Sequence, residues 1–459
     1  MAGLSSEGDT SLLRDAWTLA IESLSWIELQ RLGERLALTK AAKQLGITDP
    51  RALGLAHRLV FETMRRLNVI DAVINSVLAP RSLSDFKLGV QSFLRLFTFE
   101  TKFGEDVDSY EKTVSIARMG RSVLGWRELN DAEEALGRIL STPVEDVLKK
   151  LSDEERVALQ TYNPTWFVKY CFRILGRSEA LKFLEGTVKV SPTYVRVNTL
   201  KATEENCLAK MERDGVTVEK VPMLQYTYRV ANSRKPLVKA QSFRQGLFYI
   251  QDKASCLAAE VANPKGAEKV LDVCAAPGAK TTLMAQLMQN NGLIHSVDYS
   301  KRRMGVWKKE VKRMGVENAV PVVADAQRPL PLQLDADLVV LDPPCTSTGA
   351  FGKVPSAKWR LTKRSVLNMA EIQWIMLNNC AEHVKEGGFI VYSTCSITLE
   401  ENEMLIERFL KWHPEFTLVD TTPRIGLPGL RGQAQCQRLY PHLHECNGFF
   451  VAKLLKEVS

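Results

Sequence analysis

Short apolar runs rich in β-branched residues recur in the second half of this 459-residue chain, and segments with helical spacing separate them. Continuous runs of this kind are typical of parallel strands that are buried on both faces. We therefore expect strands near residues 269–274, 293–298, 319–324, 337–342 and 387–394, followed by strand-like segments at 415–420 and 447–454. The alternation predicts an α/β fold with a doubly wound sheet and an antiparallel edge.

Three domains are expected, because a chain of this length is too long for one hydrophobic core. Residues 1–155 keep apolar residues at helical spacing and contain little glycine, which predicts an all-helical domain. Residues 156–250 combine helical stretches with alternating strand-like segments, which predicts a small α+β module. Residues 251–459 carry the α/β pattern.

Positive charge is concentrated in the middle of the chain. Residues 161–250 hold 15 Lys and Arg against 7 Asp and Glu, a balance of +8 that equals the net charge of the whole chain. Residues 1–160 (21 against 24) and 251–459 (25 against 22) cancel each other. Such a block is typical of a surface that binds a polyanion, although a solvated basic face explains the charge equally well.

The composition favours a location in the cytoplasm. The nine cysteines are an odd number and form no CxxC pair, which argues against a disulfide framework and fits a reducing compartment. No apolar stretch is long enough for a membrane span, so we expect no membrane partner. Residues 1–15 lack the basic start and apolar core of a secretory signal.

One cluster of metal-ligating residue types has to be considered as a zinc site. It consists of Cys436, His442, His444 and Cys446. Its spacing matches no common structural zinc pattern, and Pro441 lies inside it before an apolar strand. We therefore expect no metal.

Residues 269–281 read as a strand, a tight turn of small residues and the start of a helix. Gly278 and the neighbouring alanines allow a ligand to approach the backbone closely. The spacing is neither that of a phosphate-binding P-loop nor GxGxxG, so a nicotinamide cofactor is not indicated. Four expected strands end in a carboxylate: Asp272, Asp298, Asp325 and Asp342. One such Asp is usually a turn former or helix cap, but four at one sheet edge predict a nucleoside-type cofactor.

Two cysteines follow expected strands. Cys345 ends the motif Asp342-Pro343-Pro344-Cys345, and Cys395 lies in Ser393-Thr394-Cys395-Ser396. Ligands bind at the carboxyl ends of the strands of such a sheet, so both thiols are expected to meet in one pocket, although a single free cysteine is more often a buried apolar residue.

Covalent catalysis gives two such thiols separate roles. A thiolate that adds to carbon 6 of a pyrimidine activates carbon 5 toward an electrophilic methyl group. In this chemistry Cys395 is the candidate nucleophile, Asp342 the acid at the edge of the base, and Cys345 the thiol that assists release.

These motifs resemble those of the Nop/Sun (RsmB-like) family of RNA cytosine-5 methyltransferases. The resemblance extends over about 161–455 and includes Arg196-Val197-Asn198-Thr199, the segment 246–255, and Pro441-His442 with Gly448-Phe449-Phe450. It implies a Rossmann-like methyltransferase domain with S-adenosylmethionine as cofactor. More weakly, segments 59–74 and 88–97 resemble the NusB-type RNA-binding domain of bacterial small-subunit rRNA methyltransferases.

The resemblance also implies site residues. It assigns Cys395 as nucleophile and Cys345 as the releasing thiol, as the chemistry does. It places Asp298 at the ribose hydroxyls and Asp325 near the adenine. The full implied cofactor set is Cys274, Ala275, Ala276, Pro277, Gly278, Ala279, Lys280, Asp298, Arg303, Asp325 and Asp342, and the implied RNA-binding set is Arg196, Asn198, Lys358 and His442.

Two positions depart from the family pattern. Ala279 replaces a usual glycine, and Lys358-Trp359 is all that persists of an Arg-His-Pro-Asp-containing loop, which puts substrate contacts from that loop in doubt.

Other functions compete with cytosine-5 methylation. Methylation of an exocyclic amine is expected when an aromatic residue follows Asp-Pro-Pro, but position 345 is a cysteine. A non-catalytic RNA-binding assembly factor is the alternative outside enzymes, and the intact motifs argue against it. We expect a monomeric enzyme whose RNA substrate is rRNA rather than tRNA, with a role in rRNA processing, by analogy with the NusB-like domain.

Overall fold

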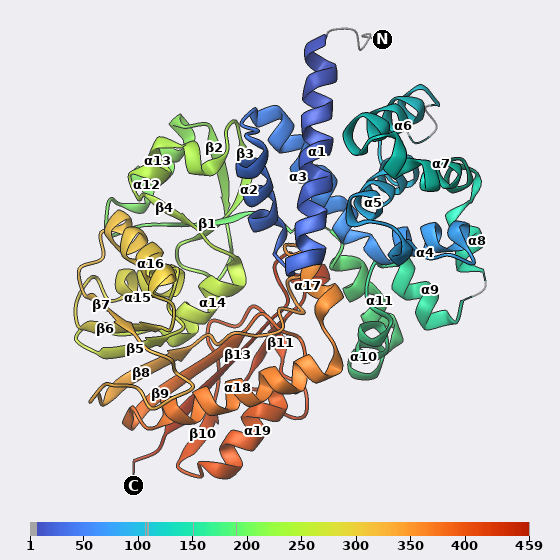
Figure 1. Ribbon diagram of the computed structural model, residues 1–459. Helices are drawn as coiled ribbons and strands as arrows, with labels where there is room; N and C mark the ends of the chain where they lie inside the picture. The colour runs from blue at the N-terminus through green and yellow to red at the C-terminus, as the bar shows by residue number, and fades with distance from the viewer. Residues whose placement is uncertain (1–6, 106, 108–109, 150, 190, 459) are drawn as a thin grey trace. The chain divides into compact units, whose positions relative to one another are not determined.

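A mixed nine-stranded sheet forms the centre of the second half of the chain in the computed structural model, which describes residues 7–105, 107, 110–149, 151–189 and 191–458 (Figure 1). The chain divides into two units. The first contains residues 1–189 and 351–360, and the second contains residues 190–350 and 361–459. Among the described residues, no helix is both long enough and apolar enough to cross a membrane.

Helices make up the first unit, as the sequence predicts for its N-terminal part. Asp49 caps α3 by accepting a hydrogen bond from Arg51 N, and Pro50 occupies the first turn, where a missing N–H costs nothing. The fully buried Phe93 and Phe97 of α5 lie in the core of this unit. The helices are α1 Glu7–Gln30, α2 Glu34–Leu45, α3 Pro50–Arg65, α4 Leu67–Leu78, α5 Leu88–Lys102, α6 Tyr110–Leu124, α7 Trp126–Ser141, α8 Val144–Leu148, α9 Asp153–Gln160, α10 Thr165–Leu175, α11 Arg177–Gly186 and α17 Pro355–Arg360.

Helix α17 reaches the first unit from a distant part of the sequence. The ring of Phe351 packs at 5.1 Å, between centroids, against Phe167 of α10. The indole of Trp359 donates a hydrogen bond to the carbonyl of Met64 at the end of α3. The sequence expectation placed residues 156–189 in the middle module and 351–360 in the catalytic domain, whereas the structure groups both segments with the N-terminal helices.

A small antiparallel sheet opens the second unit. Its strand order is β2-β3-β1-β4, and the helices α12 and α13 accompany it. Alternation along the strands buries Val195 and Val197 in one apolar cluster with Phe248. The elements are β1 Tyr194–Val197, α12 Glu204–Arg213, β2 Val216–Lys220, β3 Thr227–Ser233, α13 Gln241–Arg244 and β4 Phe248–Ile250.

The large sheet confirms the predicted doubly wound fold with an antiparallel edge. Its order is β11-β12-β13-β9-β8-β5-β6-β7, with β10 beside β13. The strands β7, β6, β5, β8 and β9 run parallel, and β13 pairs antiparallel with β9. The elements are α14 Lys253–Ala262, β5 Lys269–Val273, α15 Ala279–Leu287, β6 Leu293–Asp298, α16 Lys301–Met314, β7 Ala319–Val323, β8 Ala336–Leu341, α18 Lys363–Ala381, β9 Val384–Thr394, α19 Glu403–Trp412, β10 Phe416–Val419, β11 Leu427–Pro428, β12 Gln437–Leu439, α20 Pro441–His444 and β13 Phe449–Lys456.

The strand register brings the sequence motifs to one edge of the large sheet. Val273 of β5 pairs with both Val297 of β6 and Leu341 of β8, and Leu341 pairs in turn with Tyr392 of β9. The motif after each of these strands therefore begins at the same level. After β5 the chain adds β6 and β7 on one side of it, and then returns to add β8 and β9 on the other side. Ligands bind at such a switch point in open α/β sheets.

Candidate active site

Small residues form the turn after β5, in which Ala275, Ala276 and Gly278 are buried. Cys274 has φ +65° and Gly278 has φ +110°, so the chain folds back sharply before α15 begins. A Cβ at Gly278 would lie 3.2 Å from the Trp307 ring, and a positive φ there favours glycine in any case. Ala279 has no positive φ and starts α15, so the alanine at this position fits the backbone without strain.

The carboxylate that ends β6 is engaged within the protein. Asp298 accepts hydrogen bonds from the backbone N–H groups of Ala276 (3.3 Å) and Ser300 (3.0 Å), and the Arg303 guanidinium lies 3.2 Å away. The Asp298 side chain is 1% exposed, whereas that of Arg303 is 43% exposed. Arg303 also donates to the carbonyl of Ala276. Arg303 is thus the more accessible member of the pair.

Two of the other three strand-end carboxylates, Asp272 and Asp325, differ in their surroundings. Asp272 is buried at the end of β5 and accepts a hydrogen bond from the Thr281 hydroxyl of α15, and burial raises its pKa to about 7. The hydrogen bond between Asp272 and Thr281 connects β5 to α15. Asp325 is exposed and accepts a hydrogen bond from the backbone N–H of Gln327, so it forms a turn and leaves an oxygen free for a ligand.

Sequence reasoning missed an aromatic side chain at this edge. Tyr299 directly follows Asp298 and is 68% exposed, an unusual position for a large ring with an apolar face. A flat ring there offers a stacking surface for an adenine base. An aromatic residue immediately after a strand-end acid was the sequence signal available.

Asp342 and Lys280 form an ion pair between two of the motifs. The Lys280 ammonium lies 2.5 Å from Asp342 Oδ2, and the Ser393 hydroxyl lies 3.3 Å from Asp342 Oδ1. Burial acts to lower the pKa of Lys280, but the charge and hydrogen bond of Asp342 outweigh burial and raise it. Lys280 is 8% exposed and Asp342 is 35% exposed, so the carboxylate is the accessible member of the pair.

The two sulfurs predicted to act together lie in contact. Cys345 Sγ is 3.1 Å from Cys395 Sγ, and Ser347 Oγ is 3.3 Å from Cys395 Sγ. The hydrogen bond from Cys345 lowers the pKa of Cys395, outweighing the opposite effect of burial, and the Ser347 contact lowers it further. The same hydrogen bond, with burial, raises the pKa of Cys345. Because the thiolate is the nucleophilic form, a lowered pKa at Cys395 agrees with its assignment as the nucleophile.

The cysteines outside this pair have the surroundings of apolar core residues. Burial raises the pKa of Cys256 and of Cys380 to about 12, and it also raises the pKa of Cys171 and Cys274. In the part of the chain that the structure describes, no cluster of His, Cys, Asp and Glu has the arrangement of a metal site.

Arg196 and Asn198 have no access to RNA, which corrects the assignment made from sequence. Both are completely buried in the second unit. Arg196 donates to the side chains of Gln251, Gln286 and Thr282, and Asn198 donates to the backbone carbonyls of Gly246 and Met314. The alternation along β1 places Arg196 and Asn198 on one face of the strand, and α15 and its neighbours cover that face. Their role is to hold the small sheet against the large one.

Lys358 is also unavailable to RNA, again contrary to the sequence assignment. It is 2% exposed within the first unit, where its ammonium donates to the backbone carbonyls of Arg65 and Tyr162. Burial, reinforced by Arg65 and Arg66, lowers its pKa well below the usual range. The fourth candidate, His442, lies on α20 with an intermediate exposure and packs against the Tyr440 ring.

Helix α16 carries exposed positive charge that the sequence assignment overlooked. Its buried residues Met304, Trp307 and Val311 pack on the sheet. The opposite surface presents Lys301, Arg302, Lys308, Lys309 and Lys312, all exposed. Within the described residues, none of these five forms an ion pair with an acidic side chain. A helix face of this kind binds phosphate groups readily.

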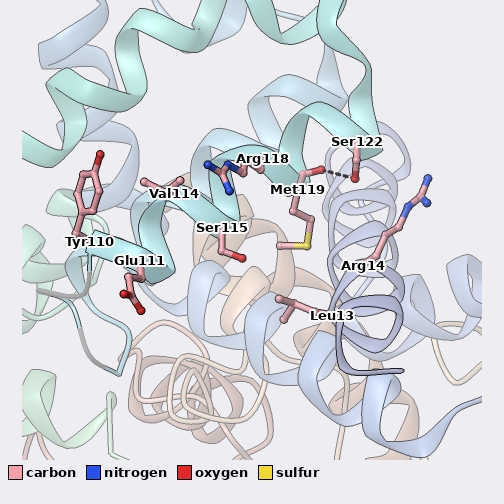
Figure 2. A pocket seen from close by; sticks show the side chains of 9 residues that line it. All are labelled: Leu13, Arg14, Tyr110, Glu111, Val114, Ser115, Arg118, Met119 and Ser122. Carbon is pink, nitrogen blue, oxygen red and sulfur yellow. Dashed lines mark hydrogen bonds between the residues drawn. The ribbon is translucent and has the colours of Figure 1, made fainter. Parts of the chain in front are cut away.

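A separate hollow lies in the first unit between α1 and α6 (Figure 2). Its volume is about 730 Å³, and Arg14, Tyr110 and Arg118 are among the side chains around it. It contains none of the residues predicted for the cofactor or for catalysis. The chemistry is therefore assigned to the sheet edge of the second unit.

Two family models match the chain. Residues 259–455 match the 16S rRNA methyltransferase RsmB/F family, and residues 163–235 match the ferredoxin-like domain of RsmF/B-like methyltransferases.

Individual relatives extend the match. The probable ribosomal RNA small subunit methyltransferase B of Bacillus subtilis is 27% identical over 96% of this chain and 98% of its own length. The tRNA (cytosine(72)-C(5))-methyltransferase of Pyrococcus horikoshii is 36% identical, but the alignment covers 48% of this chain and 55% of that enzyme. The chain thus spans about half of the tRNA enzyme and nearly all of the Bacillus relative.

A solved structure agrees with the whole fold. The crystal structure of PH0851 superposes with a TM-score of 0.81 at 30% identity, covering 96% of this chain and 98% of that one. The sharp turn after β5, the strand-end carboxylate of Asp298 and the exposed ring of Tyr299 fit S-adenosylmethionine, the methyl donor of such enzymes. The chain therefore belongs to the RsmB/F family of S-adenosylmethionine-dependent RNA (cytosine-5)-methyltransferases.

Proposed function

We propose that this enzyme methylates carbon 5 of a cytosine in ribosomal RNA through a covalent bond between Cys395 and carbon 6 of the base. The 3.1 Å contact between the two sulfurs is the observation that carries the proposal. It lies at the carboxyl edge of the sheet, with Asp342 and Lys280 contributed by the neighbouring motifs. Cytoplasmic location and a monomeric state are part of the same proposal.

The first half of the reaction uses the more acidic thiol. Cys395 Sγ adds to carbon 6, and the electron pair of the ring double bond moves toward carbon 5. Asp342, partly exposed beside Lys280, is assigned to the edge of the base that carries ring nitrogen 3 and the exocyclic amine. There it orients the ring and acts as the acid: a proton passes through its carboxyl group to ring nitrogen 3 as Cys395 adds, which neutralises the negative charge that develops on the ring. When bound, S-adenosylmethionine supplies the electrophilic methyl group that carbon 5 takes up.

The second half of the reaction restores the enzyme. Carbon 5 loses its proton to a water molecule, the electron pair of that bond re-forms the ring double bond, and the bond between Cys395 and carbon 6 breaks while ring nitrogen 3 returns its proton to Asp342. The electrons return to the Cys395 sulfur as a thiolate. Cys345, held 3.1 Å away as the less acidic thiol, is assigned to this release step.

The cofactor site follows from the three neighbouring strand ends. We assign the turn Cys274–Lys280 to the methionine and ribose portions, where the positive φ values of Cys274 and Gly278 bring backbone groups to the ligand. Asp298 is assigned to the ribose, and Tyr299 and Asp325 to the adenine.

Ribosomal RNA is the favoured substrate because of how the relatives align. The Bacillus relative, which is named for the small ribosomal subunit, aligns from end to end and so includes the N-terminal helical unit. The tRNA enzyme aligns over about half of its length. The resemblance of the helical unit to a NusB-type domain points the same way. A tRNA substrate is the alternative.

The two thiols give opposite outcomes when each is removed. Replacing Cys395 with alanine (C395A) is expected to reduce methyl transfer to background, because no group remains to activate carbon 5. Replacing Cys345 with alanine (C345A) is expected to leave RNA attached to the protein, because addition proceeds while release fails. Denaturing gels with radiolabelled RNA measure both effects. Full methylation by C345A without a slowly migrating band would contradict the two-thiol mechanism.

The pH dependence of the reaction tests the environment of Cys395. Because the hydrogen bonds with Cys345 and Ser347 lower the pKa of Cys395, its thiolate forms at a lower pH than that of an ordinary cysteine. Activity is therefore expected to rise with pH and to level off below the usual cysteine range. Ser347→Ala is expected to shift this rise to higher pH. Single-turnover rates measured from pH 6 to 10 provide the test, and Ser365→Ala at the partly exposed start of α18 serves as the matched control.

The RNA target is directly measurable. Deletion of the gene is expected to remove one or more 5-methylcytidines from small-subunit rRNA, as read by bisulfite sequencing of total RNA. Expression of the C395A variant in the deletion strain is expected to leave the same cytidines unmethylated. Loss of methylation from tRNA alone would favour the alternative substrate.

The exposed cations of α16 are expected to bind RNA phosphates. Lys308→Ala with Lys309→Ala is expected to weaken RNA binding and to flatten its dependence on salt, by about 0.7 to 0.9 in log–log slope for each phosphate that the variant no longer neutralises. Lys265 and Lys411, exposed elsewhere on the second unit, form the matched double-alanine control. Equal salt slopes for both double variants and the wild type would exclude α16 from the RNA surface.

A further inference from the structure

A single buried carboxylate connects the loops that carry the two cysteines. Glu401 lies in the turn between β9 and α19 and is completely buried. One oxygen accepts from Thr346 N at 2.8 Å and from Gln373 Nε2 at 3.0 Å. The other accepts from Ser396 Oγ at 2.6 Å, from Thr398 Oγ1 at 2.7 Å and from the Thr346 hydroxyl. Five donors thus converge on one side chain.

Two of these donor residues are the immediate neighbours of the thiols. Thr346 follows Cys345 in the loop after β8, and Ser396 follows Cys395 in the loop after β9. Since the loops come from separate strands, the distance between the sulfurs depends on what joins the loops to each other. Direct bonds contribute, including Gly349 N to the Cys395 carbonyl at 3.0 Å and the contact between the hydroxyls of Thr346 and Ser396 at 3.2 Å, and Glu401 accepts hydrogen bonds from both Thr346 and Ser396.

The backbone of Glu401 is itself fixed. The buried Tyr392 hydroxyl donates to the Glu401 carbonyl at 2.7 Å. The next residue, Asn402, donates to the Ser396 carbonyl at 2.9 Å and accepts from the Thr394 hydroxyl at 2.7 Å. These hydrogen bonds fix the backbone that carries the Glu401 carboxylate. A side chain that positions other groups has to be held in this way.

We propose that Glu401 is a positioning residue that holds Cys345 and Cys395 at the sulfur-to-sulfur distance needed for attack and release. This inference rests on the two-thiol function proposed above. Glu401 contacts neither sulfur, and it acts through Thr346 and Ser396. Removing its carboxylate leaves several buried donors without an acceptor, so the two loops must separate or rearrange to find new partners.

The charge of Glu401 and its geometry have opposite effects on Cys395, which makes the two roles separable. The negative charges of Asp342 and Glu401 raise the pKa of Cys395, and the charge of Glu401 also raises the pKa of Cys345. The hydrogen bond that Glu401 helps to maintain between the sulfurs lowers the pKa of Cys395. Loss of the charge alone therefore moves the reactivity of Cys395 to lower pH, and loss of the geometry moves it to higher pH.

Glutamine and alanine at position 401 distinguish these effects. Glu401→Gln keeps a carbonyl oxygen for Thr346 N and Gln373, and its amide can donate to the hydroxyls of Ser396 and Thr398, which rotate freely. Glu401→Ala removes every one of these bonds. We expect E401Q to retain kcat within about tenfold, and E401A to lose about 100-fold in kcat with little change in KM, as expected for a displacement of about 1 Å among reacting groups.

The decisive measurement is the rate at which Cys395 is alkylated by iodoacetamide, followed against pH by mass spectrometry on the full-length protein without RNA. We expect the E401A profile to move to higher pH than the wild-type profile, and the E401Q profile to move to equal or lower pH. The exposed carboxylate Glu371, which pairs with Arg408, provides the control variant E371A. Thermal melting establishes that each variant is folded.

Each outcome has one meaning. A folded E401A with wild-type kcat and an unshifted profile overturns the inference, and a shift to lower pH shows that Glu401 acts by charge alone. If E401A does not fold, Ser396→Ala removes one of the hydrogen bonds and is expected to move the profile in the same upward direction. If C395A keeps its activity, the proposed function itself fails. If C395A is inactive while E401A is normal, the role of Glu401 alone is excluded.

Discussion

The parallel pairing of β8 with both β5 and β9 is the constraint on which the site depends. Parallel strands in register end at the same level, so the loops that follow them share one edge without further adjustment. From this pairing come the cradle after β5, the Asp342–Lys280 pair and the contact between the two sulfurs. Chemical groups separated by up to 121 positions in sequence, from Cys274 to Cys395, thereby share one pocket.

Local sequence was sufficient for the fold class and for the reacting groups. Apolar runs defined the strands, and the motif that closed each run placed Cys345, Cys395 and Asp342 at the correct edge because the strand end fixes where the next residue lies. The assignment of RNA-binding residues did not include the cation face of α16, although its lysines and arginines lie close together in the sequence. The family comparisons confirm the enzyme class, and the individual roles of these residues stay predictions.

Polar residues in secondary elements were harder to interpret, for a physical reason. The sequence shows which face of β1 carries Arg196 and Asn198, but not which element covers that face. In the structure Thr282 and Gln286 of α15 supply partners for the guanidinium, so burial becomes favourable despite the charge. Lys358 is similar, since its carbonyl partners Arg65 and Tyr162 lie almost 300 and almost 200 positions away. Hydrogen-bond partners that are so distant in the sequence leave no local sequence pattern from which burial could be predicted.

The path of residues 351–360 has a consequence for how the molecule can be divided. The helical unit is not an N-terminal extension that a single cut removes, because ten of its residues are encoded between the Cys345 motif and α18. A fragment starting near residue 190 would keep Phe351, Lys358 and Trp359 while lacking Phe167, Tyr162 and Met64, the residues against which they pack or bond. One buried ring, one partly buried ring and a buried ammonium group would then face water. The division of this chain by packing therefore differs from any division made at a single point in its sequence.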